Sequence, residues 1–130
     1  MPLVHIHVIE NRRTPEQLRH VADVVQDVML ENFAAPDRDR YQLISEHKPG
    51  QIIAEDTGLG FERTDDIMVV QVAQQGRTQQ QKQVMYRELA ERLRNETGLA
   101  PTDLIVSVVA NTREDWSFGN GVAQFVEGHL

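Results

Sequence analysis

Two stretches of the chain, LVHIHVIENRRTPEQ (residues 3–17) and IMVVQVAQQGRTQQQ (residues 67–81), align with each other at an offset of 64 residues. In each, apolar residues alternate along the chain before a polar turn that ends in Arg-Thr. Such alternation is typical of a strand with one buried face. Each Thr begins a Thr-x-x-Gln pattern, which predicts a capping box at the start of a helix. The sequence therefore predicts a fold built from two copies of one unit.

An amphipathic helix is predicted after each capping box. In the first half, apolar residues recur at helical spacing over residues 18–29, and the helix is predicted to end near NFAAP (residues 32–36). In the second half the pattern covers residues 85–93 and stops at ETGLAP (residues 96–101), where Gly98 is the predicted C-cap. Both helices therefore have one apolar face to bury.

Each half ends in a second apolar strand, RYQLISEH (residues 40–47) in the first and DLIVSVVAN (residues 103–111) in the second. A helix that connects two strands of one sheet implies parallel pairing through a right-handed crossover. We therefore predict an α+β fold: a tandem β-α-β repeat with one four-stranded sheet and both helices on one face. The other face of the sheet would stay uncovered, which predicts an oligomer.

The chain of 130 residues is predicted to form a single domain over residues 1–130. Its two halves cover about residues 2–47 and 66–110, and a turn-rich C-terminal arm covers residues 111–130. The connecting loop, residues 48–66, is long for a compact domain, which usually indicates a functional or oligomer contact.

The composition excludes several classes of function. A net charge of -7 disfavours nucleic acid or an anionic membrane as a partner. The absence of cysteine excludes disulfides and thiolate catalysis. No apolar run approaches the roughly 18 residues of a transmembrane helix, and no signal-peptide pattern precedes the first strand. We therefore expect a soluble, cytoplasmic protein.

Pro2, directly before the first predicted strand, has two interpretations. Proline is tolerated at the first position of a strand, so Pro2 can be purely structural. Alternatively, removal of Met1 would expose a secondary amine. A terminal amine titrates near neutral pH and serves as acid, base or nucleophile, and a secondary amine can also form an iminium with a carbonyl.

Charged residues near the other element boundaries are candidate partners of such an amine. Arg77 directly precedes the helix cap, a position suited to binding a carboxylate, although a surface arginine in a turn would give the same pattern. Within PDRDRY (residues 36–41), either Asp37 or Asp39 would raise the pKa of a nearby amine, or form only surface ion pairs. Position in the sequence does not choose between these two carboxylates.

Aromatic and histidine residues provide two further candidates. Trp116, Phe118 and Phe125 lie in the C-terminal arm, where they form either a packing contact or the apolar wall of a pocket. His5 and His7 share one face of the first strand, but no third ligand follows at a suitable spacing. We therefore expect an exposed or interface position for the two histidines and no metal site.

Three stretches resemble the tautomerase superfamily and, within it, the malonate semialdehyde decarboxylase family: PDRDRYQLISEHKP (residues 36–49), IAEDTGLGFERTD (residues 53–65) and GLAPTDLIVSVVANTREDWSFGNGVAQF (residues 98–125). The resemblance spans nearly the whole chain. It implies a homotrimer whose sheets pack around a threefold axis. It also implies an amino-terminal proline, uncovered by removal of Met1, as the catalytic amine.

The resemblance also assigns roles to individual residues. The catalytic amine corresponds to Pro2, and the family's aspartate corresponds to Asp39. The family carries two arginines two positions apart before the second helix; here Arg77 fills the second position and Gln75 stands at the first. Because Gln75 brings no charge, carboxylate binding should depend on Arg77, and a hydratase side activity that needs two cations is in doubt. The residues that correspond to the pocket wall are Trp116, Phe118, Phe125 and Leu130.

The reaction that the resemblance implies is the cofactor-independent decarboxylation of a small 3-oxo acid, malonate semialdehyde first, to acetaldehyde and carbon dioxide. Pro2 would act as a general acid or form an iminium. One alternative is a keto–enol tautomerase, or a hydratase or dehalogenase of unsaturated three-carbon acids. Another is a non-catalytic, trimeric binding protein. No metal or organic cofactor is expected, because the carbonyl of the substrate is itself the electron sink.

Overall fold

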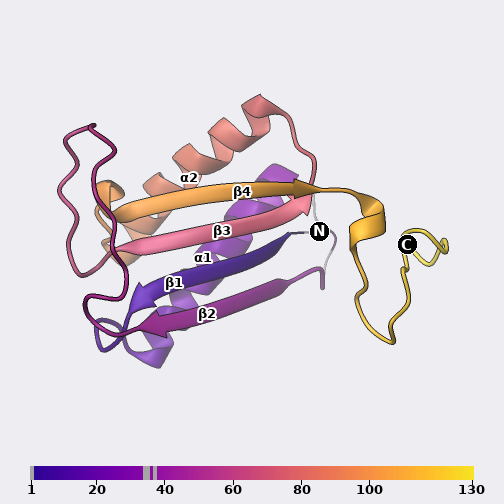
Figure 1. Ribbon diagram of the computed structural model, residues 1–130, viewed down its shortest axis with the longest axis horizontal. Coiled ribbons are helices and arrows are strands. Elements are labelled where there is room, and N and C mark those ends of the chain that lie inside the picture. Colours follow the sequence, from indigo (N-terminus) through magenta and orange to yellow (C-terminus); the bar gives the residue numbers. More distant parts are fainter. Residues whose placement is uncertain (1, 34–35, 37) are drawn as a thin grey trace.

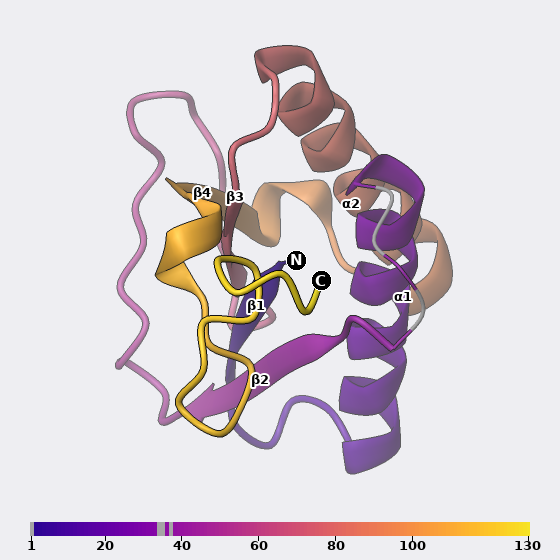
Figure 2. The same cartoon turned by 90° about the vertical axis from the view of Figure 1, so that its right-hand side faces the viewer.

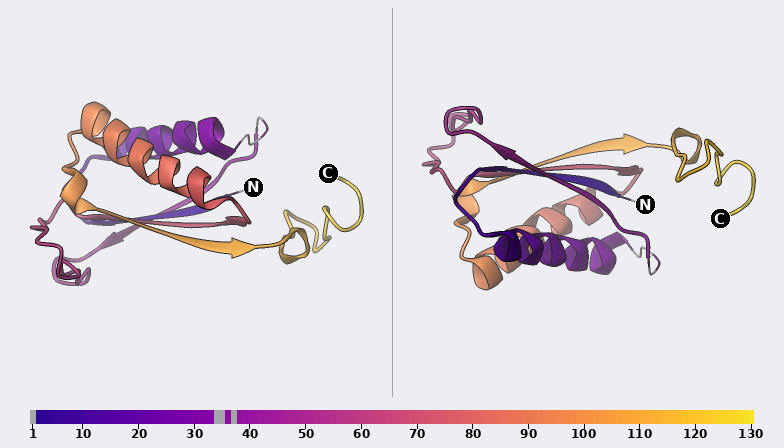
Figure 3. Two further views of the ribbon diagram at one scale, coloured as in Figure 1. Left: turned by 90° about the horizontal axis from the view of Figure 1, so that it is seen from above. Right: turned by 90° about the horizontal axis from the view of Figure 1, so that it is seen from below.

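The computed structural model describes residues 2–33, 36 and 38–130. One four-stranded sheet has the strand order β2-β1-β3-β4, and both helices cover the same face of it (Figures 1 and 3). The predicted α+β fold with a tandem β-α-β repeat is confirmed. Its elements are β1 (Leu3–Ile9), α1 (Pro15–Phe33), β2 (Tyr41–His47), β3 (Met68–Gln75), α2 (Gln79–Thr97) and β4 (Leu104–Asn111).

The strand register brings the functional segments to one end of the sheet. Strands within each half pair in parallel, as predicted, whereas β1 and β3 join the halves as an antiparallel pair. Leu3 lies opposite Tyr41 on β2 and opposite Ala73 on β3. The start of β1, the start of β2 and the end of β3 therefore meet at the same end of the sheet.

Both helices begin with the predicted capping box. The side chain of Thr14 accepts a hydrogen bond from the backbone N–H of Gln17 at 3.1 Å, and the Gln17 side chain accepts one from the Thr14 N–H at 2.9 Å. Thr78 and Gln81 repeat the same two bonds at the start of α2. α2 ends at Gly98 in the left-handed conformation, with φ of 79°, as predicted for a C-cap. In the described part of the chain, no helix is long and apolar enough to cross a membrane.

The core lies between the sheet and the helices. Ile6 of β1, Val70 of β3 and Val25 of α1 are fully buried there. No helix of the described chain covers the opposite face of the sheet (Figure 3). On that open face, the side chains of Leu43 and Val109 are 53% and 63% exposed. The uncovered face predicted from the sequence is therefore present, and it carries apolar side chains.

The C-terminal arm follows β4 and contains one short 3₁₀ helix, η2 (Arg113–Asp115). Figures 1 and 2 show the arm beyond the end of the sheet at which β1 begins. The two ends of the chain therefore lie at the same end of the molecule.

Candidate active site

A buried carboxylate lies at the start of β2. Asp39 is 5% exposed, and its backbone N–H donates to the Pro36 carbonyl at 3.1 Å, which closes the turn before the strand. Burial raises the pKa of the Asp39 carboxyl, whereas the positive charge of the chain's amino terminus and a hydrogen bond with it act in the opposite direction. The strand register places Asp39, two residues before Tyr41, at the end of the sheet where β1 begins. The other carboxylate considered from the sequence, Asp37, lies outside the described residues.

Pro2 is buried directly before β1. Leu3 is the first paired residue of β1. Continued by one residue toward the amino terminus, the register places Pro2 opposite Gln74 of β3 on one side and opposite Arg40, just before β2, on the other. Pro2 therefore lies close to the segment that carries Asp39. This position suits both interpretations of Pro2, the start of a strand and a catalytic amine.

The aromatic residues of the arm form one cluster, with Phe118 at its centre. The Phe118 ring stacks on Tyr41 of β2, with 5.5 Å between ring centroids, and on Trp116, with 5.4 Å. Phe125 meets Phe118 edge to face at 5.5 Å. The Trp116 Nε1–H donates to the side-chain oxygen of Asn111 at 2.8 Å, which fixes the indole to the end of β4. The arm is thus folded back against the edge of the sheet.

A cavity of about 410 Å³ separates this cluster from the carboxylate, and its lining includes Asp39, Tyr41, Phe118 and Leu130. Sequence pattern left two interpretations of the arm, a packing contact and a pocket wall. The structure supports both, because Phe118 packs on Tyr41 and also faces the cavity. Three of the residues singled out from the sequence, Asp39, Phe118 and Leu130, therefore come together.

Arg77 lies outside the lining of this cavity. Its guanidinium carbon sits 5.3 Å from the centroid of the Phe33 ring, and its nitrogens donate to the carbonyls of Phe33 at 3.4 Å and Gly76 at 3.2 Å. Within the described part of the chain it forms no ion pair. Gln75 is the last residue of β3 and lies opposite Asn111. The charge of Arg77 is therefore available to an anion at this end of the sheet.

Gln74 is a polar residue that the sequence analysis missed. Its side chain is completely buried, and neither amide atom has a hydrogen-bond partner among the described residues. Unsatisfied buried amides are rare because each costs free energy. The signal was present in the sequence: Gln74 continues the alternation of Met68, Val70 and Val72, at a position where an apolar residue is expected.

Histidines gather on the open face of the sheet. The rings of His5 and His7 stack with 3.9 Å between centroids, and Nδ1 of His7 lies 2.9 Å from Nε2 of His47. Nε2 of His5 lies 2.6 Å from the Ser45 hydroxyl. Across the described residues, no group of three histidine or carboxylate side chains is arranged to hold a metal ion. Burial and the two neighbouring imidazoles lower the pKa of His5.

Comparison with known proteins fixes the family. Residues 39–119 match one family model described as tautomerase enzyme, and residues 2–62 match a second with the same description. The chain belongs to the tautomerase family. Over 130 residues, all of both chains, this tautomerase is 48% identical to the probable tautomerase YrdN of Bacillus subtilis (strain 168). Over 128 residues, which is 98% of this chain and 100% of the relative, it is 33% identical to the probable tautomerase YusQ of the same organism.

Solved structures of malonate semialdehyde decarboxylases are similar to this tautomerase over nearly its whole length. One superposes with a TM-score of 0.94 and 37% identity, covering 98% of each chain. Another is FG41 malonate semialdehyde decarboxylase inhibited by 3-bromopropiolate. It superposes with a TM-score of 0.93 and 41% identity, covering 98% of this chain and 97% of the other. A fused 4-OT trimer shares the fold, with a TM-score of 0.78 and 18% identity over 97% of this chain and 98% of the other. The resemblance inferred from the three sequence stretches is confirmed.

Proposed function

We propose that this member of the tautomerase family decarboxylates a small 3-oxo acid, with malonate semialdehyde as the first candidate, and needs no cofactor. One bond breaks, between the α-carbon and the carboxylate carbon; the carboxylate leaves as carbon dioxide and the α-carbon takes up a proton, giving acetaldehyde. The observation that carries the proposal is the buried carboxylate of Asp39 in a cavity walled by Phe118, at the end of the sheet where Pro2 precedes β1. The likeness to two solved decarboxylases supports the choice of substrate.

The amine of Pro2 is the proposed acid. Removal of Met1 makes this secondary amine the start of the chain. A carboxylate such as Asp39 favours the protonated form of a nearby amine. Protonated Pro2 would donate a hydrogen bond to the aldehyde oxygen and stabilise the enolate that forms as the C–C bond breaks. The alternative role is addition of neutral Pro2 to the aldehyde, which loses water to give an iminium that accepts the same electron pair.

Arg77 is the proposed partner of the substrate carboxylate, and Gln75 adds a neutral hydrogen-bond donor beside it. Because Arg77 packs on the Phe33 ring and lies outside the cavity, this role requires its side chain to turn toward the substrate. Around the leaving group, an apolar wall would favour neutral carbon dioxide over a carboxylate. Phe118 and Leu130 line the cavity, and Trp116 and Phe125, which lie outside its lining, pack on Phe118 and would complete the wall.

We further propose that the protein works as a cytoplasmic homotrimer. The open face of the sheet exposes apolar side chains such as Leu43 and Val109, and a second copy would remove them from water. Sedimentation equilibrium measures the mass of the assembly directly. A monomer at micromolar concentration would rule out the homotrimer.

The experiment that tests the reaction begins with mass spectrometry, to verify that the purified chain starts at Pro2. Decarboxylation of malonate semialdehyde is then compared with phenylpyruvate tautomerisation in the same preparation. Pro2→Ala and Arg77→Ala should each lower decarboxylation by at least about 100-fold, in line with the loss of an acid or of a charged anchor. Arg87→Ala, on an exposed turn of α2, is the matched control. Full activity of Pro2→Ala would rule out both proposed roles of the amine.

Borohydride separates the two roles of Pro2. Reduction in the presence of substrate traps an iminium as a stable adduct on the amino-terminal residue, which mass spectrometry detects. Turnover without an adduct supports the protonated amine, whereas an adduct on Pro2 supports the iminium.

A keto–enol tautomerase is the second candidate, because the relative at 48% identity is a probable tautomerase. In that reaction Pro2 would be neutral and act as a base. The pH–rate profile discriminates between the two: a base loses activity as pH falls through its pKa, whereas an acid loses activity as pH rises.

A further inference from the structure

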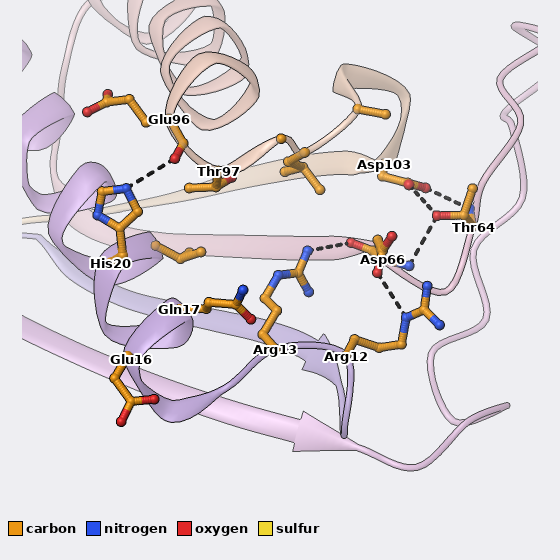
Figure 4. Close-up of a pocket in the computed structure, with 14 residues that line it drawn as sticks. Arg12, Arg13, Glu16, Gln17, His20, Thr64, Asp66, Glu96, Thr97 and Asp103 are labelled. Carbon is orange, nitrogen blue, oxygen red and sulfur yellow. Dashed lines mark hydrogen bonds and ion pairs between the residues drawn. The ribbon is translucent and has the colours of Figure 1, made fainter.

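A second cavity has a volume of about 560 Å³ (Figure 4). Its lining residues lie around the end of β1 and the starts of β3 and β4, so it is at the opposite end of the sheet from Asp39. The internal repeat explains its position, because the offset of 64 residues carries Pro2, Asp39 and Arg77 onto residues that line this cavity. The antiparallel pairing of β1 with β3 turns the two halves in opposite directions, so equivalent sites fall at opposite ends. The equivalent residues are Pro2 and Asp66, Asp39 and Asp103, and Arg77 and Arg13.

The second cavity has no amine. Asp66 lies inside the chain, and its backbone N–H donates to the Thr64 hydroxyl at 3.1 Å. The carboxylate of Asp103 accepts hydrogen bonds from both the backbone N–H of Thr64, at 2.7 Å, and the Thr64 hydroxyl. Thr64, in the segment before β3, thus forms the hydrogen bonds with Asp103 that an amine would form at the equivalent position in the other half. Amine catalysis is therefore impossible in this half, although the cavity itself remains.

The other acidic side chains of the lining are also engaged elsewhere. Asp66 is paired with Arg12 at 2.9 Å, and Glu96 is paired with Arg92 at 2.7 Å. Figure 4 shows the carboxylate of Glu16 pointing away from the other side chains of the cavity. Asp66 and Glu96 are therefore paired with arginines, Glu16 is directed outward, and Asp103 is held by its hydrogen bonds with Thr64.

Arg13 differs from these residues because, within the described residues, no carboxylate contacts it as an ion pair, although Asp66 and Asp103 lie near enough to attract its charge. Its guanidinium donates one hydrogen bond, from Nη2 to the backbone carbonyl of Asp66 at 2.9 Å. Nη1 is buried and has no hydrogen-bond partner in the described part of the chain, and no carboxylate there forms an ion pair with Arg13. Removal from water lowers the pKa of Arg13, and the attraction of Asp66 and Asp103 does not offset this effect. A half-buried cation whose desolvation is not offset by its neighbours is costly, and a bound anion would relieve that cost.

We propose that this cavity is a second, non-catalytic site that binds a small carboxylate through Arg13. The guanidinium presents two parallel donors that match the two oxygens of a carboxylate. Val21, Leu99 and Ala100 give the cavity an apolar side, which suits a short hydrocarbon body better than the fully charged surface of a phosphate. The volume lies within the range of about 300–1,000 Å³ that is usual for small-molecule pockets.

The test is a titration of the ¹⁵N-labelled, full-length Arg77→Ala protein with sodium butyrate, followed by NMR. The Arg77→Ala background weakens carboxylate binding at the other end of the sheet. Butyrate is expected to shift amide signals around the second cavity, at Gln17, His20 and Gly98. Adding Arg13→Gln should raise the dissociation constant at least tenfold. Adding Arg19→Gln, whose side chain is 73% exposed on the same helix and outside the cavity, should leave it unchanged.

Three results would overturn the proposal. Shifts confined to the surroundings of Asp39 and Phe118 would mean that butyrate does not enter the second cavity. An unchanged dissociation constant in Arg13→Gln would mean that Arg13 does not hold it. Inorganic phosphate that binds there more tightly than butyrate would contradict the ligand class. If Arg13→Gln does not fold, Arg13→Lys keeps the charge but loses the paired donors; weaker butyrate binding supports the proposal, and equal binding contradicts it.

Discussion

Asp39 and Asp103 stand at equivalent positions, 64 residues apart, each within two residues of the start of the second strand of its half. Both are buried, at 5% and 1% exposure. Their surroundings differ. Asp103 accepts two hydrogen bonds from Thr64, whereas Asp39 lies beside the positive charge of the amino terminus. One carboxylate therefore has a structural role in the repeat, and the other is the candidate for chemistry. Replacing each in turn should separate stability from activity.

Asp39→Asn should abolish catalysis without unfolding the protein. The substitution removes the negative charge that would keep the Pro2 amine protonated, so decarboxylation should fall by at least about 100-fold, the usual contribution of a positioned acid. Steady-state rates with malonate semialdehyde measure the effect. Circular dichroism should show an unchanged fold, and a variant with more than half of the parent rate would exclude Asp39 from the mechanism.

The same variant should be more stable than the parent at neutral pH. Burial raises the folded-state pKa of Asp39, so the protonated form contributes stability at low pH, and this contribution is lost as pH rises through the raised pKa. The amide that replaces the carboxyl group stays neutral at every pH. The melting temperature of Asp39→Asn should therefore exceed that of the parent at pH 7, and the difference should shrink toward pH 4. A lower melting temperature at pH 7 would show that attraction to the amino terminus outweighs the cost of burial.

Asp103→Asn should have the opposite outcome. An amide can still accept from the Thr64 N–H, but its NH₂ group would have to donate to the Thr64 hydroxyl, and the two charge-assisted hydrogen bonds of the carboxylate are lost. The free energy of unfolding should therefore fall by about 1–3 kcal/mol. Urea titration measures this loss. Decarboxylation should stay within about twofold of the parent. Asp65 is exposed and follows Thr64 in the sequence, so Asp65→Asn is the control and should be close to neutral in both assays.

The C-cap of α2 gives a prediction about the fold alone. Gly98 has φ of 79°, and a Cβ built there meets no atom within 4 Å, so Gly98→Ala would suffer only from backbone strain. The cost should be about 1–2 kcal/mol in urea unfolding. Gly76 also has open space around its Cβ position but no positive φ, so Gly76→Ala is the matched control and should be nearly neutral. Equal effects of the two substitutions would contradict the argument.

The helices and strands were predictable from the sequence because their signals are local. The alternation around Val4 and Val70 and the capping boxes at Thr14 and Thr78 each depend on a few neighbouring residues. The repeat then fixed the parallel pairing within each half. It did not reveal that β1 and β3 pair in antiparallel, because that contact joins residues far apart in the chain and depends on how the two units fit together.

The candidate site was only partly predictable for the same reason. The resemblance to the family chose Asp39, but no local pattern showed that Arg77 would pack on the ring of Phe33. Gln74 was not singled out, although its place in the alternation of Met68, Val70 and Val72 is visible in the sequence. No local pattern marked Arg13 either, because its hydrogen bond to the Asp66 carbonyl joins residues 53 positions apart.

Phe118 provides the last prediction, because its ring joins the arm to the sheet. Phe118→Ala removes the contacts with Tyr41, Trp116 and Phe125, so the arm should loosen and open the cavity beside Asp39 to water. Decarboxylation should fall by at least about tenfold, since a wet site weakens the electrostatic effect of the amine. Trp116 is the single tryptophan, and its fluorescence should shift to longer wavelength. Phe61→Ala, in the exposed connecting loop, should change neither signal. A loss of activity without the fluorescence shift would mean that Phe118 contacts the substrate directly and does not act through the arm.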